Sequence, residues 1–185
     1  MRFWPTELAD VRLIELEPAS DERGCFARTF CTREFSAAGL ETRFVQHSLS
    51  YTARAGSVRG LHLQRPPHEE AKLIRCVRGA INDVLIDLRP ASSSYLEWQA
   101  YELTADNRRQ LYVPAGFAHG FQTLADDTEV AYLISAFYAP EAAAGIRHDD
   151  KAFAIPWPLP LADISVKDRS WPDFVADAPL TVPVA

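Results

Sequence analysis

The sequence predicts an all-β fold, an antiparallel sandwich or barrel with few helices. Thirteen prolines and eight glycines are spread along the 185 residues and divide the chain into short elements. Most runs between them alternate polar and apolar residues, which is the period of a half-buried strand. The βαβ rhythm that a parallel sheet needs is missing. The length and the apolar content of 48% suit a single domain, expected over residues 1–175.

The elements follow from local signals. One helix is expected over 32–40, with Thr32 as its N-cap and Gly39 at its end. Gly79 and Ala80 lie between two strand-like runs, which we expect to form a hairpin. The strand-like runs are, in order, 11–18, 60–64, 72–79, 80–90, 95–104, 109–124 and 129–140. The proline-rich 155–160 is expected as extended surface chain and 176–185 as partly disordered.

Composition excludes several classes of partner. The net charge of −6 argues against a general nucleic-acid or anionic-membrane binder. The longest apolar stretch, 131–139, is too short to span a bilayer, and no secretory signal is evident. Three cysteines without C-x-x-C spacing are typical of reduced thiols. We therefore expect a cytoplasmic protein with neither nucleic acid nor membrane as partner.

A basic segment interrupts this acidic chain. Residues 54–78 contain six lysines or arginines against two acidic residues. Such charge is usually a solvated face, an interpretation that suits His68, Arg75 and Arg78. The concentration nevertheless indicates a local pocket for a small anion, because arginine forks match phosphate oxygens and lysine supplies a point charge.

Strand parity places the candidate side chains. In 60–64, Leu61 and Leu63 point to one face while His62 and Gln64 point to the other. In 129–138, Tyr132 and Tyr138 share a face, so the two phenols either line one concavity or are core rings with satisfied hydroxyls.

Two chemistries compete for these residues. The segment 113–121 has the P-x-G-x-x-H pattern of the second cupin motif, but His62 lacks the second histidine that the first motif needs. A metal site assembled from distant partners stays an alternative. Without metal, a histidine abstracts a carbon-bound proton next to a carbonyl, and a cation such as Lys72 stabilises the enolate.

The chain resembles the dTDP-4-dehydrorhamnose 3,5-epimerase family over about residues 5–170. The matching blocks are DERGCF (21–26), FVQ (44–46), VRGLHLQRPPHEEAKLIRCVRG (58–79), DVLIDLR (83–89), RRQLYVPAGFAHGFQTL (108–124), FYAPE (137–141), GIRHDD (145–150), WPLP (157–160) and SVKDR (165–169). The resemblance implies a cupin-like double-stranded β-helix, or jelly roll, with a few short helices. It also implies a homodimer with strand exchange, a nucleotide-diphosphate sugar as substrate, and neither metal nor redox cofactor.

The resemblance assigns roles residue by residue. His62 matches the catalytic base, Asp168 its carboxylate partner, and Tyr132 the acid that reprotonates carbon on the opposite face. Lys72 matches the residue that holds the enolate. The positions that match substrate-binding residues are Arg23, Phe26, Gln46, Arg59, Asp83, His119, Tyr138 and Lys167, with Asp83 as the partner of His119.

Three positions depart from the family pattern. Arg28 stands where a carboxylate is expected near the nucleotide base, Ser48 where an asparagine is expected, and Cys25 where an aromatic is expected. Because arginine only donates hydrogen bonds, Arg28 would favour cytosine N3 over thymine N3–H, or else its side chain points away. A cytidine-linked sugar is thus an alternative to the dTDP-linked one.

The implied reaction is inversion at C3, C5 or both of a 4-keto-6-deoxy hexose in deoxysugar or surface-polysaccharide biosynthesis. The alternatives are a mono-epimerase or keto-isomerase of a CDP-linked sugar, a non-catalytic binder, and a metal-dependent cupin.

Overall fold

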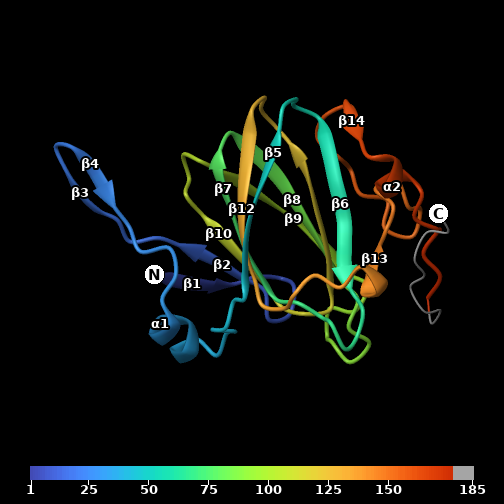
Figure 1. Cartoon of the computed structure of the whole chain (residues 1–185), viewed down its shortest axis with the longest axis horizontal. Helices are drawn as coiled ribbons and strands as arrows, with labels where there is room; N and C mark the ends of the chain where they lie inside the picture. Colours follow the sequence, from blue (N-terminus) through green and yellow to red (C-terminus); the bar gives the residue numbers. More distant parts are fainter. Residues whose placement is uncertain (177–185) are drawn as a thin grey trace.

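The computed structural model describes residues 1–176. Two antiparallel sheets face each other in it (Figure 1). The first sheet has the order β1 (Arg2–Pro5), β2 (Arg12–Glu15), β10 (Gln110–Val113), β7 (Lys72–Arg78), β12 (Thr128–Ile134) and β5 (Gln46–Thr52). The second has the order β13 (Ala143–Gly145), β6 (Ser57–Gln64), β11 (Phe117–Thr123), β8 (Ala80–Asp87) and β9 (Trp98–Thr104), with β14 (Asp163–Ile164) parallel to β6. The all-β, cupin-like prediction is confirmed.

The helical elements are short. They are α1 (Thr32–Ala37), the 3₁₀ turn η1 (Pro140–Ala142) and α2 (Val166–Arg169). The N-cap of α1 is Cys31, so the prediction of Thr32 was wrong by one residue. Gly39 ends the helix as predicted: it has φ +71°, and Leu40 N donates to Phe35 O at 2.9 Å, the closing bond of a Schellman motif. The helices of residues 1–176 are all much shorter than a membrane-spanning helix must be.

The predicted hairpin at Gly79 is wrong. β7 pairs with β10 and β12, whereas β8 pairs with β11 and β9 in the other sheet. Gly79 is the point where the chain crosses between sheets: its φ is +75°, and an added Cβ would lie 2.3 Å from Thr128 Oγ1. The runs 72–79 and 80–90 are both apolar on their inward faces. A hairpin and a crossing between sheets produce the same sequence pattern, so the sequence could not distinguish them.

Other boundaries also moved. The run 109–124 is two strands, β10 and β11, separated at Pro114–Gly116, and the run 129–140 is a strand only as far as Ile134. β3 (Ala19–Asp21) and β4 (Gly24–Phe26) form a separate hairpin that projects from the body of the molecule (Figure 1). The predicted disorder of 176–185 falls, from residue 177 onward, outside the described residues.

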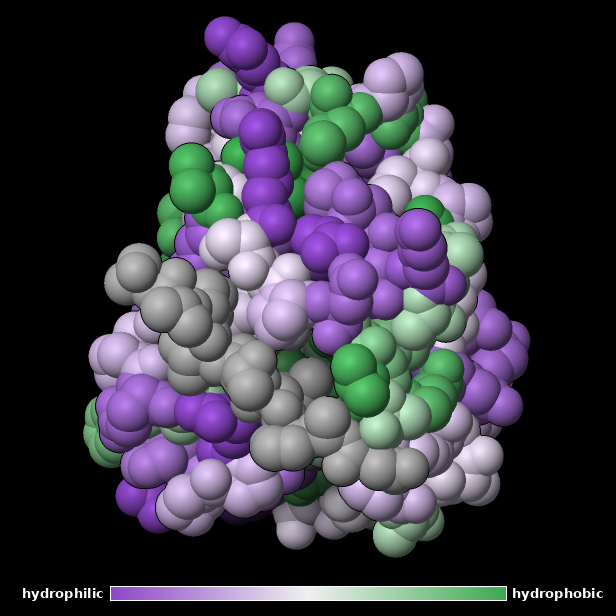
Figure 2. Space-filling view, turned by 90° about the vertical axis from the view of Figure 1, so that its right-hand side faces the viewer, coloured by the Kyte–Doolittle hydropathy of each residue, from purple (hydrophilic) through white to green (hydrophobic). Residues whose placement is uncertain are grey.

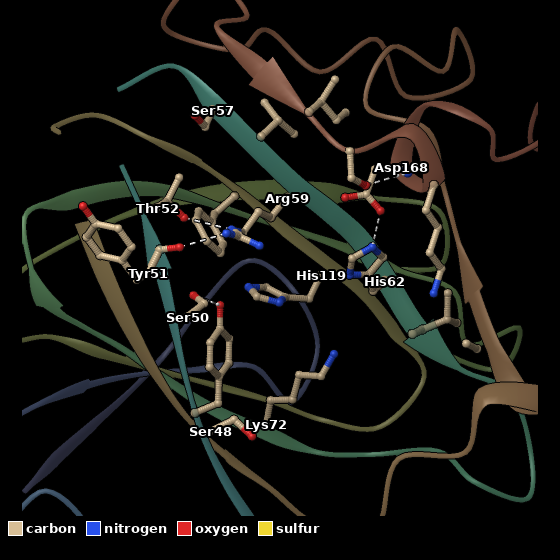
Figure 3. Close-up of a pocket in the computed structure, with 18 of the residues that line it drawn as sticks. Ser48, Ser50, Tyr51, Thr52, Ser57, Arg59, His62, Lys72, His119 and Asp168 are labelled. Carbon is tan, nitrogen blue, oxygen red and sulfur yellow. Dashed lines mark hydrogen bonds and ion pairs between the residues drawn. The ribbon is translucent and has the colours of Figure 1, made fainter. Parts of the chain in front are cut away.

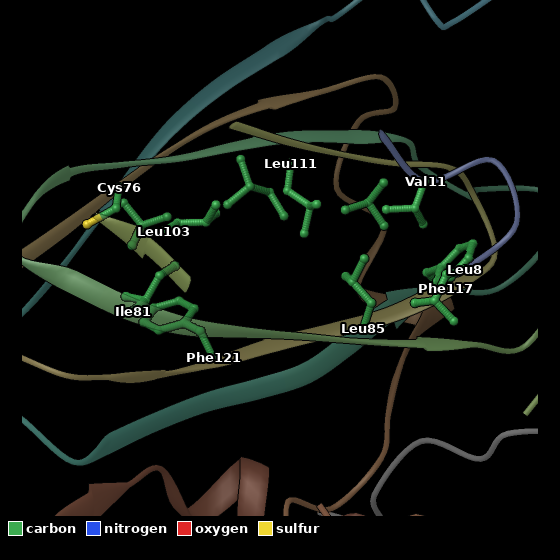
Figure 4. Packing of buried hydrophobic residues seen from close by; sticks show 12 residues of the cluster. Leu8, Val11, Cys76, Ile81, Leu85, Leu103, Leu111, Phe117 and Phe121 are labelled. Atoms are coloured by element: carbon green, nitrogen blue, oxygen red, sulfur yellow. The ribbon is translucent and has the colours of Figure 1, made fainter. Parts of the chain in front are cut away.

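The main core fills the space between the sheets. Its members come from the inward faces of both sheets and from the loop before β2, and most of them are drawn in Figure 4. The space between the sheets on the side of β5 and β6 is left to a cavity, which Phe121 also lines. The buried residues are Leu8, Val11, Ile74, Cys76, Ile81, Leu85, Leu103, Leu111, Val113, Phe117, Phe121 and Val130.

Two further clusters cover the outer faces. Phe35 of α1 packs with Ile14 and Leu73 on the first sheet, and Leu61 packs with Phe153 of the C-terminal segment on the second. The side that carries β14 and α2 is mostly hydrophilic, with separate small apolar groups (Figure 2). The packing of Phe153 on Leu61 holds the C-terminal segment on the second sheet, beside the cavity.

Candidate active site

A cavity of about 1070 Å³ lies between the two sheets. β5, β7 and β12 form one wall, β6 and β11 the other, and the segment 162–171 part of the rim. Figure 3 shows His62, His119, Arg59 and Lys72 directed toward the same space. Ten of the sequence-predicted residues line it: His62, Tyr132, Asp168, Lys72, Gln46, Ser48, Arg59, His119, Tyr138 and Lys167.

A β-bulge brings Arg59 and His62 to the same face of β6. His119 of β11 lies opposite His62 and Phe121 opposite Arg59, so β6 has one residue more than β11 between these pairs. Gly60 is at the bulge with φ +111°, and an added Cβ there would lie 2.6 Å from Gly120 Cα. Strict alternation would have put residues 59 and 62 on opposite faces. The parity prediction is confirmed for the residues that follow the bulge: Leu61 and Leu63 pack in the outer cluster with Phe153, whereas His62 is directed into the cavity and Leu63 only borders it.

His62 is paired with a carboxylate from the far end of the chain. Its Nε2 is 2.5 Å from Asp168 Oδ1. Asp168 is fixed in turn: Ser165 Oγ accepts its N–H at 3.0 Å, and Gly60 N–H donates to its Oδ2 at 3.3 Å. Since a carboxylate accepts hydrogen bonds, this contact places the imidazole proton on Nε2 and leaves Nδ1 as the basic nitrogen.

The charge of Asp168 is maintained by its neighbours. Burial by itself would raise its pKa, but the hydrogen bond and charge of His62, with the Gly60 N–H and Ser165, bring the pKa below its usual value. Asp168 is therefore a carboxylate at neutral pH, positioned to stabilise a protonated His62.

Tyr132 contacts the cavity from the opposite sheet. Its ring lies edge-on to that of His119, with centroids 6.2 Å apart, and its hydroxyl is 3.4 Å from Ser50 Oγ. Burial raises the pKa of Tyr132 above that of an ordinary phenol, which keeps the group protonated. A neutral phenol and a histidine base thus face the cavity from different sheets.

Several cations at the cavity have no carboxylate partner. Within residues 1–176, Arg54, Arg59 and Lys167 form no ion pair, and Arg59 donates instead to Thr52 Oγ1 and to Tyr51 O, both at 2.8 Å. Lys167 lies 5.6 Å from the centre of the Trp171 ring. Their uncompensated charge suits a ligand with phosphate groups.

Tyr138 lines the cavity, but it does so from a loop and not from the strand face that it was predicted to share with Tyr132. It follows the end of β12, so strand parity does not place it. Gln46 and Gln64 hold the segment instead: Gln46 Oε1 accepts from Tyr138 N at 2.8 Å, and Gln64 accepts from Ala139 N and donates to Phe137 O. Gln46, predicted to bind substrate, therefore uses its oxygen to position Tyr138.

Four predicted residues lie outside the cavity. Asp83 is buried behind His119, with its Oδ1 2.6 Å from His119 Nε2. Arg23 and Phe26 lie on the projecting β3–β4 hairpin, where the exposed fractions are 84% for the Arg23 side chain and 79% for Phe26. Arg28 follows this hairpin and pairs with Glu34 at 3.0 Å. The nucleotide-base role of Arg28 stays a prediction.

Sequence reasoning missed several lining residues. Ser50 and Thr52 continue the face of Gln46 and Ser48 along β5, a parity that would have found them. Glu70 precedes β7 by two residues and pairs with Lys72. Trp171 packs its ring 6.3 Å from that of His62. The described residues contain no group of three or more His, Cys, Asp or Glu side chains placed to hold a metal ion.

Comparisons with known proteins agree with this site. The family model for dTDP-4-dehydrorhamnose 3,5-epimerase matches residues 5–176. The chain belongs to this family. The enzyme of that name from Methanothermobacter thermautotrophicus is 46% identical over 92% of each chain.

Solved structures show the same relation. The crystal structure of the Bacillus anthracis dTDP-4-dehydrorhamnose 3,5-epimerase with TDP and pyrophosphate bound is 41% identical, with a TM-score of 0.91 over 94% of this chain and 99% of that one. A Streptomyces niveus relative, 36% identical over 91% of this chain and 82% of its own, is named a 3-epimerase. Our chain is thus an epimerase, and the family does not favour the CDP-linked alternative.

Proposed function

We propose that this epimerase inverts C3 and C5 of a dTDP-linked 4-keto-6-deoxy hexose. The convergence of His62–Asp168, Lys72 and Tyr132 on one cavity carries the proposal. These are the groups that proton transfer next to a ketone requires: a base, a cation for the enolate, and an acid.

The first step is deprotonation. His62 Nδ1 takes the proton from the carbon next to the C4 ketone, and the C–H electron pair forms the enolate double bond. The Lys72 ammonium stabilises the negative charge that develops on the C4 oxygen. Asp168, 2.5 Å from Nε2, stabilises the imidazolium that results.

The second step is reprotonation from the other side. Tyr132 belongs to β12 of the first sheet, whereas His62 belongs to β6 of the second, so the two groups contact a bound sugar ring from opposite faces. The phenol O–H delivers its proton to carbon, the enolate returns to the ketone, and Tyr132 is left as phenolate. Solvent then reprotonates Tyr132 and removes the proton from His62, which resets the site for the second centre.

The diphosphate occupies the cationic rim. Arg59, Arg54 and Lys167 supply the charge, and Ser48, Gln46 and His119 line the path between rim and sugar. Tyr138 is 58% exposed at the mouth, where its ring is available to stack on the nucleotide base.

A homodimer would complete the mouth of the cavity, where the nucleotide binds. Arg23 and Phe26 are carried on a hairpin that projects from the body of the chain (Figure 1). Phe26 is a large apolar side chain that is exposed. We propose that each chain, as one domain over 1–175, extends this hairpin to the cavity of a second copy. Light scattering on the purified protein tests the dimer: the proposal requires twice the chain mass, and a monomer would contradict it.

We also propose that the enzyme works in the cytoplasm. Cys25, Cys31 and Cys76 are all unpaired thiols, which suits a reducing compartment.

The reaction is tested by proton NMR of the native enzyme with dTDP-4-keto-6-deoxyglucose in D₂O. Loss of the C3 and C5 proton signals and appearance of an inverted product are expected. Exchange at C3 alone would make the enzyme a 3-epimerase, and exchange at neither carbon would contradict the proposal. The CDP-linked analogue serves as the comparison, and we expect it to react more slowly.

A further inference from the structure

Lys72 forms an ion pair with Glu70, a glutamate that is largely shielded from solvent. Lys72 Nζ is 3.0 Å from Glu70 Oε1, and the exposed fractions of the two side chains are 10% and 12%. Both residues line the cavity. Such a pair is not a solvated surface contact, and removal of one partner leaves the other charge poorly solvated.

The second oxygen of Glu70 is also occupied. Gln64 Nε2 donates to Glu70 Oε2 at 2.9 Å. The orientation of the Gln64 amide is fixed, because its Oε1 accepts from Ala139 N at 2.6 Å. Its two Nε2 hydrogens face three acceptors, which are Glu70 Oε2, His68 O at 2.9 Å and the more distant Phe137 O at 3.2 Å, so one N–H is shared. Gln64 is 3% exposed, so the donor that it presents to Glu70 is held in place by the interior.

Glu70 therefore lies between two donors. An ionised carboxylate accepts on both oxygens, whereas a glutamine amide would place an N–H₂ group toward either Lys72 or Gln64. The contact with Gln64 sets where the carboxylate lies, and the carboxylate sets where the ammonium lies. The chain of contacts runs from Ala139, next to Tyr138 at the mouth, through Gln64 and Glu70 to Lys72.

We propose that Glu70 is the positioning residue that holds the Lys72 ammonium at the C4 oxygen of the substrate. This inference rests on the proposed function, in which Lys72 stabilises the enolate. A flexible lysine has many rotamers, and the anchored carboxylate selects the one in which Nζ faces the cavity. The effect of Glu70 is then on the chemical step, and the rim cations govern binding of the diphosphate.

The test compares kcat and KM of Glu70→Gln with those of Glu69→Gln. Glu69 is an exposed neighbour and gives the same change in charge. We expect Glu70→Gln to lower kcat about 10- to 100-fold, since a displaced catalytic group costs about that much, with KM changed less than about threefold. Glu69→Gln should keep the native kcat. Glu70→Asp retains the charge but retracts it by one methylene, and should give an intermediate kcat.

A double-mutant cycle separates positioning from a purely structural role. If Glu70 acts through Lys72, then Glu70→Gln has no further effect on kcat in a Lys72→Met background. Native kcat in both Glu70→Gln and Glu70→Asp, or an equal fall in kcat with and without Lys72, would overturn the inference. Failure of the native enzyme to exchange substrate protons would instead overturn the proposed function itself.

Discussion

Two histidine–aspartate pairs lie side by side in this molecule, and they differ in what surrounds them. His62 and His119 are directly opposite each other on β6 and β11, and each has Nε2 2.5–2.6 Å from a carboxylate. The side chain of His62 is 44% exposed to the cavity, whereas that of His119 is 6% exposed. The two pairs therefore have the same geometry. His62 can act as the base because it is exposed to substrate, whereas His119 is nearly buried.

The carboxylates differ as well. Asp83 comes from β8, the strand next to β11, and its side chain is fully buried. Asp168 comes from a short helix more than a hundred residues away from His62 in sequence. Ser165 caps this helix, and the Gly60 N–H and His62 hold Asp168 against β6. The His119–Asp83 pair joins neighbouring strands inside the second sheet. The His62–Asp168 pair joins a strand of that sheet to a separate C-terminal segment.

Replacement of the two histidines should give the largest difference. We expect His62→Ala to reduce deuterium exchange at the substrate carbons by about 10³- to 10⁴-fold, the upper range for loss of a general base. His119→Gln should reduce it about tenfold or less, because His119 lines the cavity with only 6% of its side chain exposed and its Nε2 is already paired with the buried Asp83. Exchange rates in D₂O measure both variants, and equal losses would refute the distinction between the two pairs.

Replacement of the carboxylates comes next. Asp168→Asn should reduce kcat about 10²- to 10⁴-fold, since the imidazole loses the partner that fixes its tautomer. Asp83→Asn should act mainly on stability, lowering the free energy of unfolding by about 1–3 kcal/mol through a weakened buried hydrogen bond. Urea unfolding and kcat, measured on both variants, separate these effects. A catalytic loss in Asp83→Asn as large as in Asp168→Asn would contradict the account.

Tyr132→Phe should impair inversion of configuration while deuterium exchange at the substrate carbons continues. His62 is intact in this variant, so deuterium still enters the substrate, while inversion falls about 10²-fold because the opposite face lacks its acid. Ser50→Ala, which removes the hydroxyl 3.4 Å from the phenol, is the matched control and should change inversion less than tenfold. Loss of exchange together with inversion in Tyr132→Phe would make Tyr132 part of the deprotonation step.

The pH dependence should show the smallest effect. Because the pKa of Asp168 is lowered on folding, its contribution to stability is present above the usual value of 3.8 and is lost as pH falls through the lowered value. The difference in unfolding free energy between native enzyme and Asp168→Asn should therefore be present above about pH 5 and shrink below about pH 4. A difference that already shrinks at pH 6 would contradict the direction of this shift.

The rate of inversion at alkaline pH depends on the ionisation of Tyr132. Burial raises its pKa above the ordinary value of 10.0, so its ionisation should cause no fall in inversion below about pH 10. A fall near pH 8 that is absent in Tyr132→Phe would contradict this.

Sequence patterns located the side of β6 that faces the cavity, since Leu61 and Leu63 alternate with His62. They could not show that Arg59 joins the same face, because the bulge at Gly60 depends on the register with β11. The crossing at Gly79 was mistaken for a hairpin for a related reason: partner choice between sheets is a tertiary property. Only resemblance pointed to Asp168, and Glu70 went unnoticed because its role depends on Gln64 and Lys72 together.

The most direct test of the central claim is proton NMR of native enzyme and His62→Ala with dTDP-4-keto-6-deoxyglucose in D₂O, with circular dichroism to verify the fold of the variant. Native enzyme should replace the protons at C3 and C5 with deuterium, and His62→Ala should leave both in place. Exchange by folded His62→Ala at the native rate would contradict the assignment of His62 as the base.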